Sequence, residues 1–88
     1  MRIRTENVTW QEIDGELVIL DLQTSAYLTT NVVGTALAKY LTEERTPADL
    51  TTFLMSTYDI DEQTARQDSQ VFVDQLRSKS LLIEPEIG

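Results

Sequence analysis

Short apolar runs in the first third of the chain alternate with polar turns, as expected for a small sheet. Residues 8–13 are rich in residue types that favour strands, and residues 17–22 are apolar on nearly both faces. Such a run suits a central strand covered on one side by helices. Asp14 and Gly15 between them are the commonest signal for a tight hairpin turn. A polar turn then leads to a short third strand over 26–29, so the pattern predicts a three-stranded antiparallel meander.

The next segment changes to helical spacing. Asn31 is a good N-cap residue, and apolar side chains then recur at intervals of three and four residues. A glycine inside this helix, Gly34, costs about 1 kcal/mol relative to alanine, so we expect close packing to require it. The charged residues 43–45 end the element. Its predicted apolar positions are Val33, Leu37, Tyr40 and Leu41.

A second helix begins with a strong local signal. Thr46 is placed to cap it, Pro47 occupies the first helical position, and Asp49 completes an arrangement like a capping box. Residues 58–60 close this helix. The apolar stripe that we expect to be buried consists of Leu50, Phe53 and Leu54.

The third and longest helix is predicted over residues 62–79, with Asp61 as its cap. Acidic residues at its start and basic residues at its end both suit the helix dipole. Residues 81–84 are predicted to form a short extended wing strand. One side of the helix carries Ala65, Ser69, Phe72, Val73 and Leu76, and the adjacent flank carries Asp68, Val71, Gln75 and Lys79.

Together these elements predict an α+β fold. We expect a winged helix-turn-helix with an N-terminal three-stranded antiparallel sheet, followed by three helices and a short C-terminal wing strand. Eighty-eight residues make a single domain over 1–88, with an ordered core from about 8 to 84. A chain of this length buries only about 60% of its unfolded surface, which leaves little room for a deep catalytic cavity.

The charge of the chain excludes several classes of partner. Fifteen acidic residues against seven basic ones give a net charge of −8, a sign that opposes binding to nucleic acid and to anionic membranes. A DNA-reading helix also needs a basic surround, and the third predicted helix is nearly neutral. The sequence has no apolar run of membrane-spanning length and no signal-peptide pattern. We therefore expect a cytoplasmic protein without a nucleic-acid or membrane partner.

The chemistry of the side chains argues against catalysis. The chain contains neither histidine nor cysteine, which removes disulfides, thiolate chemistry, the usual zinc sites and the commonest acid–base residue. Its serines lack a histidine to activate them, and its three glycines form no phosphate-binding loop. We expect a protein that is not an enzyme and that has no metal ion or cofactor.

The predicted sheet ends on the short strand at 26–29, which leaves an edge with unpaired amide and carbonyl groups. Such an edge can bind another chain as an added strand. Main-chain hydrogen bonds do not depend on the sequence of the ligand, so side chains that enter a groove beside the strand must provide discrimination. The sequence thus favours a module that binds an unfolded peptide segment.

Several local patterns follow one another in a set order along residues 8–84. The patterns are DGELVILDL at 14–22, SAY at 25–27, NVVGTAL at 31–37, TPADL at 46–50, YDI at 58–60, Ala65 with Asp68, and the closing segment 76–82. This ordered set, rather than any single motif, resembles PqqD-like proteins, the leader-recognition elements of ribosomally synthesised and post-translationally modified peptides.

The resemblance implies a winged-helix domain without catalytic activity. Such proteins take the leader of a precursor peptide as an extra antiparallel strand on the third strand and against the third helix. Stand-alone versions accompany lasso-peptide pathways, where they present the precursor to a separate leader peptidase; a cyclase of the same pathway is a further candidate partner. PqqD itself is less similar, because its characteristic Pro-Glu-Gly turn is missing before the third strand.

Individual residues can be assigned to the expected groove. Val71 lies about 100° around the helix from Phe72. It is therefore a groove candidate, whereas Phe72 is expected in the core with its edge reaching the groove. Tyr27 either flanks the ligand or fills the core, and Leu28 points to the opposite face. Asp68 either holds a basic ligand residue or a backbone amide, or is simply a solvated acid.

The full set of predicted peptide-binding residues spans the third strand and the third helix. Gln75 and Lys79 complete it as candidates for bonds to polar groups of the ligand. The set is Ser25, Ala26, Tyr27, Leu28, Thr29, Asp68, Val71, Phe72, Gln75 and Lys79.

Two alternative functions remain open at this point. One is a winged-helix domain with a structural or regulatory role that binds a protein partner through its helix faces. The other is a PqqD chaperone of quinone-cofactor biosynthesis.

Overall fold

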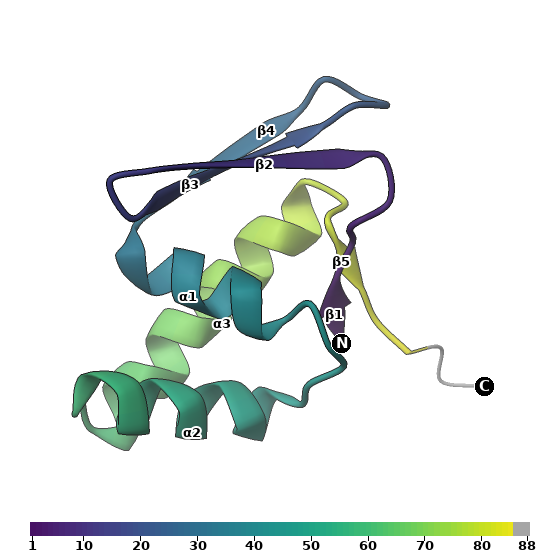
Figure 1. The fold of residues 1–88 in the computed structure, drawn as a ribbon. Coiled ribbons are helices and arrows are strands. Elements are labelled where there is room, and N and C mark those ends of the chain that lie inside the picture. Colours follow the sequence, from purple (N-terminus) through teal and green to yellow (C-terminus); the bar gives the residue numbers. More distant parts are fainter. Residues whose placement is uncertain (86–88) are drawn as a thin grey trace.

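The computed structural model describes residues 1–85, and its main sheet lies over three helices (Figure 1). The predicted α+β fold, with a three-stranded antiparallel sheet, three helices and a C-terminal strand, is confirmed. In chain order the elements are β1 (Arg2–Ile3), β2 (Val8–Ile13), β3 (Glu16–Asp21), β4 (Tyr27–Thr30), α1 (Val32–Tyr40), α2 (Pro47–Tyr58), α3 (Glu62–Ser78) and β5 (Leu82–Ile83).

Strands β2, β3 and β4 pair antiparallel in that order, with β3 in the centre. The β2–β3 hairpin turns at Asp14 and Gly15, whose φ values are 53° and 82°. Positive φ at both central residues is the property of a type I′ turn, which matches the twist of the two strands. The predicted meander is thus correct, and its two edge strands are β2 and β4.

The register of β4 decides which of its side chains is buried. Leu28 pairs with Ile19 and faces the helices, where both side chains are buried. Tyr27 pairs with Leu20 on the opposite face, and Tyr27 is 63% exposed. Of the two alternatives that the sequence left open, Leu28 therefore belongs to the core and Tyr27 to the outer face of the sheet.

The three helices begin at the predicted caps. Asn31 and Asp61 accept backbone N–H bonds of 2.9 and 2.8 Å, and Thr46 and Asp49 form a complete capping box. These bonds satisfy amides that the first helical turn leaves without partners. They also lower the pKa of Asp49 and of Asp61, because a backbone N–H donor favours the ionised carboxylate.

The ends of several elements differ by one or a few residues from the sequence prediction. Strand β4 begins at Tyr27 rather than at residue 26, because Ser25 adopts a left-handed φ of 63° and extends the turn. Helix α1 ends at Tyr40, whose carbonyl accepts a hydrogen bond of 3.0 Å from Arg45. Helix α3 ends at Ser78, and Lys79 is its C-cap.

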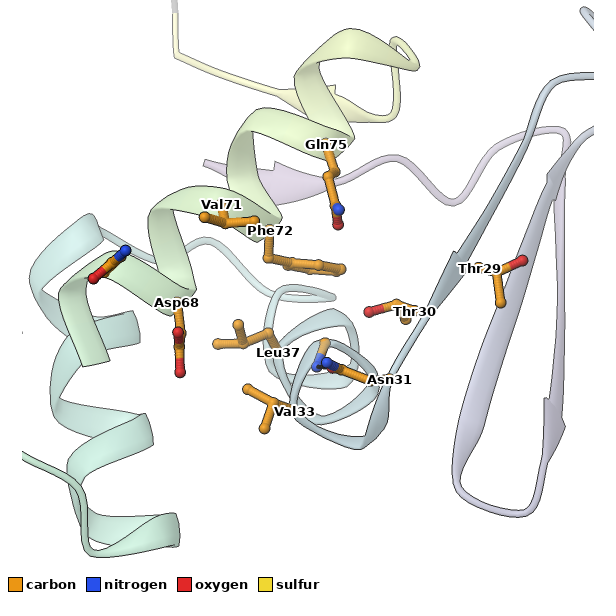
Figure 2. Close-up of a pocket in the computed structure, with 11 residues that line it drawn as sticks. Thr29, Thr30, Asn31, Val33, Leu37, Asp68, Val71, Phe72 and Gln75 are labelled. Atoms are coloured by element: carbon orange, nitrogen blue, oxygen red, sulfur yellow. Dashed lines mark hydrogen bonds between the residues drawn. The ribbon is translucent and has the colours of Figure 1, made fainter. Parts of the chain in front are cut away.

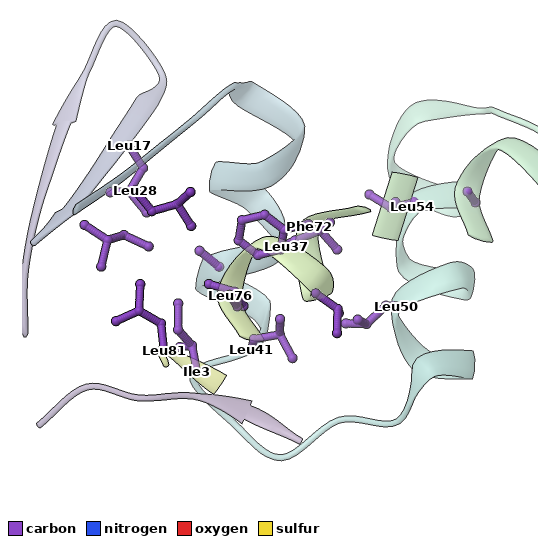
Figure 3. Packing of buried hydrophobic residues seen from close by; sticks show 14 residues of the cluster. Ile3, Leu17, Leu28, Leu37, Leu41, Leu50, Leu54, Phe72, Leu76 and Leu81 are labelled. Atoms are coloured by element: carbon purple, nitrogen blue, oxygen red, sulfur yellow. The ribbon is translucent and has the colours of Figure 1, made fainter. Parts of the chain in front are cut away.

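The core lies between the inner face of the sheet and the helices, and α2 packs against α3 on the side away from the sheet (Figures 1 and 3). Helix α3 contributes the buried side that its spacing predicts. Trp10 and Phe53 pack against this core while remaining partly exposed. The buried apolar residues are Ile3, Leu17, Ile19, Leu28, Leu37, Ala38, Leu41, Leu50, Leu54, Ala65, Phe72, Val73, Leu76 and Leu81.

A second, two-stranded sheet joins the two ends of the described chain. Arg2 pairs with Ile83 and Ile3 with Leu82, and Ile3 is fully buried. The wing strand was predicted at 81–84, whereas its partner β1 was not predicted. A strand of two residues carries too little alternation for a sequence pattern to detect it. Within residues 1–85, no helix has the length and apolar character needed to cross a bilayer.

Candidate functional site

The open edge of β4 presents unpaired backbone groups to solvent. Asp21 donates its backbone N–H to the carbonyl of Ala26 at 2.8 Å, which identifies Ala26 as bonded toward β3. Because backbone groups alternate in direction along a strand, Leu28 also bonds toward β3, and Tyr27 and Thr29 direct their N–H and C=O groups outward. Two donors and two acceptors therefore line this edge.

A cavity of about 320 Å³ lies beside the C-terminal end of β4, between α1 and α3 (Figure 2). Its inner wall is apolar and includes Leu37 and Phe72, both buried, while the exposed side chain of Val71 stands at its rim. Polar side chains of α3 complete the rim. The lining residues are Thr29, Thr30, Asn31, Val33, Gly34, Leu37, Gln67, Asp68, Val71, Phe72 and Gln75.

Gly34 lets α1 approach both β4 and α3 at this cavity. A Cβ atom at position 34 would lie 2.9 Å from Cβ of Thr30, 3.2 Å from Cδ1 of Phe72, and in direct overlap with Oγ1 of Thr30. The expectation that close packing requires this glycine is therefore confirmed. Thr30 and Phe72, which both line the cavity, are therefore close neighbours of Gly34.

The turn that precedes β4 is held by a buried ion pair. Asp21, fully buried, pairs with Arg4 and also accepts the backbone N–H of Gln23 at 2.9 Å. The Gln23 N–H and the Arg4 guanidinium lower the pKa of Asp21 despite its burial. Arg4 further donates to the carbonyls of Glu6 and Ser80, at 2.9 and 3.2 Å. The start of β4 is thus fastened to the N-terminal segment and to the turn after α3.

The structure brings together half of the residues that the sequence predicted for the groove. Val71 is 52% exposed and lies off the buried stripe, as its helical angle predicted, whereas Phe72 is in the core and reaches the cavity. The predicted residues that line the cavity are Thr29, Asp68, Val71, Phe72 and Gln75.

The other half lies outside the cavity for definable reasons. Ser25 is in the turn, Leu28 is in the core, and Tyr27 is on the outer face of the sheet. Ala26 belongs to the bonded end of the turn, and Lys79 lies beyond the last turn of α3. Their contact with a ligand would come through the strand edge or through the flank of α3, and that part of the assignment stays a prediction.

Six lining residues were not predicted as site residues. Gln67 precedes Val71 by one helical turn, so the spacing of the groove flank contains a signal for it. The others depend on where the start of α1 lies relative to α3, and spacing within one element contains no such information. The six are Thr30, Asn31, Val33, Gly34, Leu37 and Gln67.

The lining of the cavity is chemically mixed. The cavity has a single ionisable side chain, Asp68, and it offers hydroxyl, amide and apolar surfaces. Among the residues described by the structure, no three side chains of the metal-binding acidic types gather at one place. The geometry provides a cavity with an apolar inner wall and a polar rim, next to a row of free backbone donors and acceptors.

Comparison with known proteins identifies the family of this chain. The family described as coenzyme PQQ synthesis protein D (PqqD) matches residues 16–82, which is most of the chain. The chain belongs to the PqqD family. The family resemblance expected from the sequence is thus confirmed, and the matched segment contains β3, β4 and all three helices of the PqqD-like fold.

Solved structures with the same PqqD-like fold include two complexes. TbiB1 in complex with the TbiA(beta) leader peptide is 30% identical, with a TM-score of 0.81, and the match covers 98% of this chain and 99% of that chain. A lasso peptide synthetase B1 complexed with the leader peptide is 24% identical, with a TM-score of 0.77, covering 94% and 96% of the two chains. Among curated proteins, none matches the sequence significantly.

Proposed function

We propose that this protein is a non-catalytic module that captures the leader segment of a ribosomally synthesised precursor peptide. The leader adds as an antiparallel strand to β4, against α3, and the module presents the precursor to a separate leader peptidase of a lasso-type pathway. The observation that supports the proposal most strongly is that an unpaired strand edge adjoins a cavity with an apolar inner wall. The leader-bound relative TbiB1 supports it as well.

The backbone of β4 supplies affinity that is independent of ligand sequence. The outward N–H and C=O groups of Tyr27 and Thr29 can form four main-chain bonds. At about 0.5–1.5 kcal/mol net for each bond, they contribute about 2–6 kcal/mol. Association and ordering cost roughly 4–15 kcal/mol, so these bonds alone do not hold a peptide.

The cavity supplies the remaining affinity and the discrimination. A strand paired with β4 turns alternate side chains toward the helices, where the cavity opens between β4 and α3 (Figure 2). An apolar side chain that is fully buried against Phe72, Leu37 and Val71 contributes about 1.5–3 kcal/mol. Two such anchors raise the gross gain of anchors and backbone bonds to about 12 kcal/mol at most, and the smallest association cost leaves about 8 kcal/mol, which corresponds to a dissociation constant near micromolar.

A second candidate uses the same site for a different peptide. The family description itself refers to coenzyme PQQ synthesis, and a PqqD chaperone would also capture a precursor peptide through an added strand. The two candidates differ in the ligand and in the enzyme that receives it. Genes for a precursor peptide and for processing enzymes, if found beside this one, would distinguish them.

Fluorescence-polarisation titration tests the proposed site with a matched pair of variants. Val71→Glu places a carboxylate at the cavity rim, where a bound peptide would remove it from water. Val32→Glu is the control, because Val32 is equally exposed, at 53% against 52%, and packs toward Gly15 rather than α3. The labelled ligands are the leader of any precursor peptide encoded near this gene and the TbiA(beta) leader peptide.

We expect Val71→Glu to weaken binding by about 100-fold or more, equal to about 3 kcal/mol, while Val32→Glu binds like the unmodified protein. Circular dichroism checks that both variants are folded. Equal affinity of the two variants would contradict the assignment of the cavity as the peptide-binding site. If neither leader bound the unmodified protein, the proposed function would be contradicted.

A further inference from the structure

The charged side chains of α3 and of its C-cap residue, Lys79, divide into paired and unpaired ones. Arg66 pairs with Glu62, and Arg77 pairs with both Asp74 and Glu84. The two that make no ion pair or side-chain hydrogen bond with any residue in 1–85 are Asp68 and Lys79, and both are exposed. Within residues 1–85, they are thus the only charged side chains of α3 and its C-cap that remain free to pair with a ligand.

These two charges lie on the same flank of α3. Eleven residues separate Asp68 from Lys79, which is three turns of an α-helix to within about 20°. Val71 and Gln75, which also line the cavity, lie between them on this flank. The flank therefore carries an acid at one end, an apolar and an amide group in the middle, and a base at the other end.

The separation of the two charges corresponds to a short stretch of strand. Eleven residues of helix rise about 16 Å, and a strand covers that distance in about five residues. The nearest spacings that keep both side chains on the same face of the strand are four and six residues. Helix α3 and β4 run in opposite directions across the groove (Figures 1 and 2). A ligand strand antiparallel to β4 consequently runs in the same direction as α3, with its N-terminal part near Asp68 and its C-terminal part near Lys79.

We propose that Asp68 and Lys79 select the charge order of the bound peptide. The preferred ligand carries a cationic side chain at its N-terminal part, beside Asp68, and an acidic side chain four or six residues later, on the same face of the strand and beside Lys79. Between them an apolar side chain enters the cavity next to Val71. This inference rests on the proposed strand addition to β4, and it adds the charge pattern and the register of the peptide.

Opposite charges at the two ends give the groove a direction that backbone bonds do not provide. A peptide threaded in the wrong direction, or shifted by several residues, would lose both attractions or place like charges together. Each exposed pair changes affinity only modestly, by up to about fivefold. Two ion pairs in a fixed order are nevertheless enough to favour one register of the peptide over others that form the same number of backbone hydrogen bonds.

Selection from a displayed library of random peptides tests this inference. One bait is the unmodified protein, and a second carries Asp68→Lys together with Lys79→Asp, which reverses the two charges without changing the net charge. A control bait carries Glu62→Arg together with Arg66→Glu. That swap reverses an exposed ion pair of the same helix that does not line the cavity.

We expect the unmodified protein and the control to enrich peptides with Lys or Arg four or six residues before Asp or Glu, because only an even spacing keeps both side chains on one face of the strand. The charge-reversed bait should enrich the opposite order around the same apolar anchor. Each selected peptide should bind its own bait at least about tenfold more tightly than the reversed one, and added salt should reduce this preference.

The possible results separate this inference from the proposed function. If all three baits enrich one peptide family with the same charge positions, or with no charge preference, the charge register is overturned while peptide capture stands. If no bait enriches any peptide that competes with a leader, both the register and the proposed strand addition are overturned.

Discussion

The two edges of the main sheet differ although both leave backbone groups unpaired. On β2, the N–H of Leu22 donates a hydrogen bond to the carbonyl of Asn7, so Asn7 is bonded toward β3. Backbone groups alternate in direction along the strand, so those of Trp10 and Glu12 point outward. Glu12 also forms an ion pair of 2.8 Å with Lys39 of α1. Strand β4 carries no charge in Tyr27–Thr30, and a cavity opens beside it.

This contrast shows how a small sheet can leave one edge strand open to a ligand while the other edge strand is protected by charge. Charged side chains on an edge strand oppose the addition of a foreign strand, because pairing would force them out of water. Edge β2 has such a charge pair, whereas edge β4 has an exposed valine, Val71, across the groove. We infer that β4 accepts a partner strand and that β2 is protected from one.

Proline substitutions at the two edges should give the largest difference. Thr29→Pro removes an outward N–H and places a ring where the ligand strand would lie, so we expect affinity for the leader to fall by about 100-fold. Glu12→Pro removes an outward N–H from β2 and should leave affinity unchanged. Leu28 is a poorer position for proline, because its N–H bonds to β3 and the change would disturb the sheet.

Isothermal titration of the leader into both proline variants measures this difference. Thermal unfolding of each variant is the control, because edge positions with outward N–H groups tolerate proline. If both proline variants lost the same affinity for the leader, the proposed difference between β2 and β4 would be contradicted.

A methyl group at Gly34 should damage the β4 side of the molecule by a smaller amount. Gly34→Ala brings Cβ against Thr30 and Phe72, so we expect the free energy of unfolding to fall by about 1–3 kcal/mol. Thr30→Ala in the same chain removes the overlapping Oγ1 and should recover part of this loss. Urea denaturation of the single and double variants measures both values, and additive losses in the double variant would contradict this contact.

The ion pair before β4 should make the fold sensitive to acid. The folded pKa of Asp21 is lowered, so its stabilising contribution is present above the unfolded pKa of about 3.9 and is lost as pH falls through the folded pKa. We expect the free energy of unfolding to fall more steeply on acidification in the unmodified protein than in Asp21→Asn. Parallel profiles from about pH 6 to pH 3 would show that Asp21 does not provide this dependence.

The exposed pair on β2 should have the smallest effect on stability. Glu12→Val removes its ion pair with Lys39, which contributes at most about 1 kcal/mol. The substitution also leaves an uncharged second edge, so we expect concentration-dependent association that the leader peptide does not displace. Sedimentation analysis measures this association. A variant that stays monomeric at high concentration would show that the charge pair is not what protects β2.

Much of the fold could be predicted because its signals are local. The hairpin at Asp14 and Gly15, the caps at Asn31 and Asp61, and the capping box begun by Thr46 each depend on a few neighbouring residues. The spacing along α3 separated its buried side from its exposed flank for the same reason. Strand β1 was missed because its pairing with β5 joins the two ends of the described chain.

The site was predicted only in part because it depends on the relative position of separate elements. Alternation showed that Tyr27 and Leu28 face opposite ways, but only the pairing of β4 with β3 decides which side faces the helices. Thr30 and Val33 line the cavity because Gly34 brings α1 close to β4 and α3. That contact follows from the packing of three elements and has no counterpart in the spacing of any one of them.

Amide hydrogen exchange of β4, with and without the leader peptide, tests the central claim most directly. In the free protein the outward amides of Tyr27 and Thr29 should exchange rapidly, and the bound leader should protect both. The outward amides of Trp10 and Glu12 should keep their rates. Protection at β2, or a bound leader that leaves Tyr27 and Thr29 unchanged, would contradict strand addition at β4.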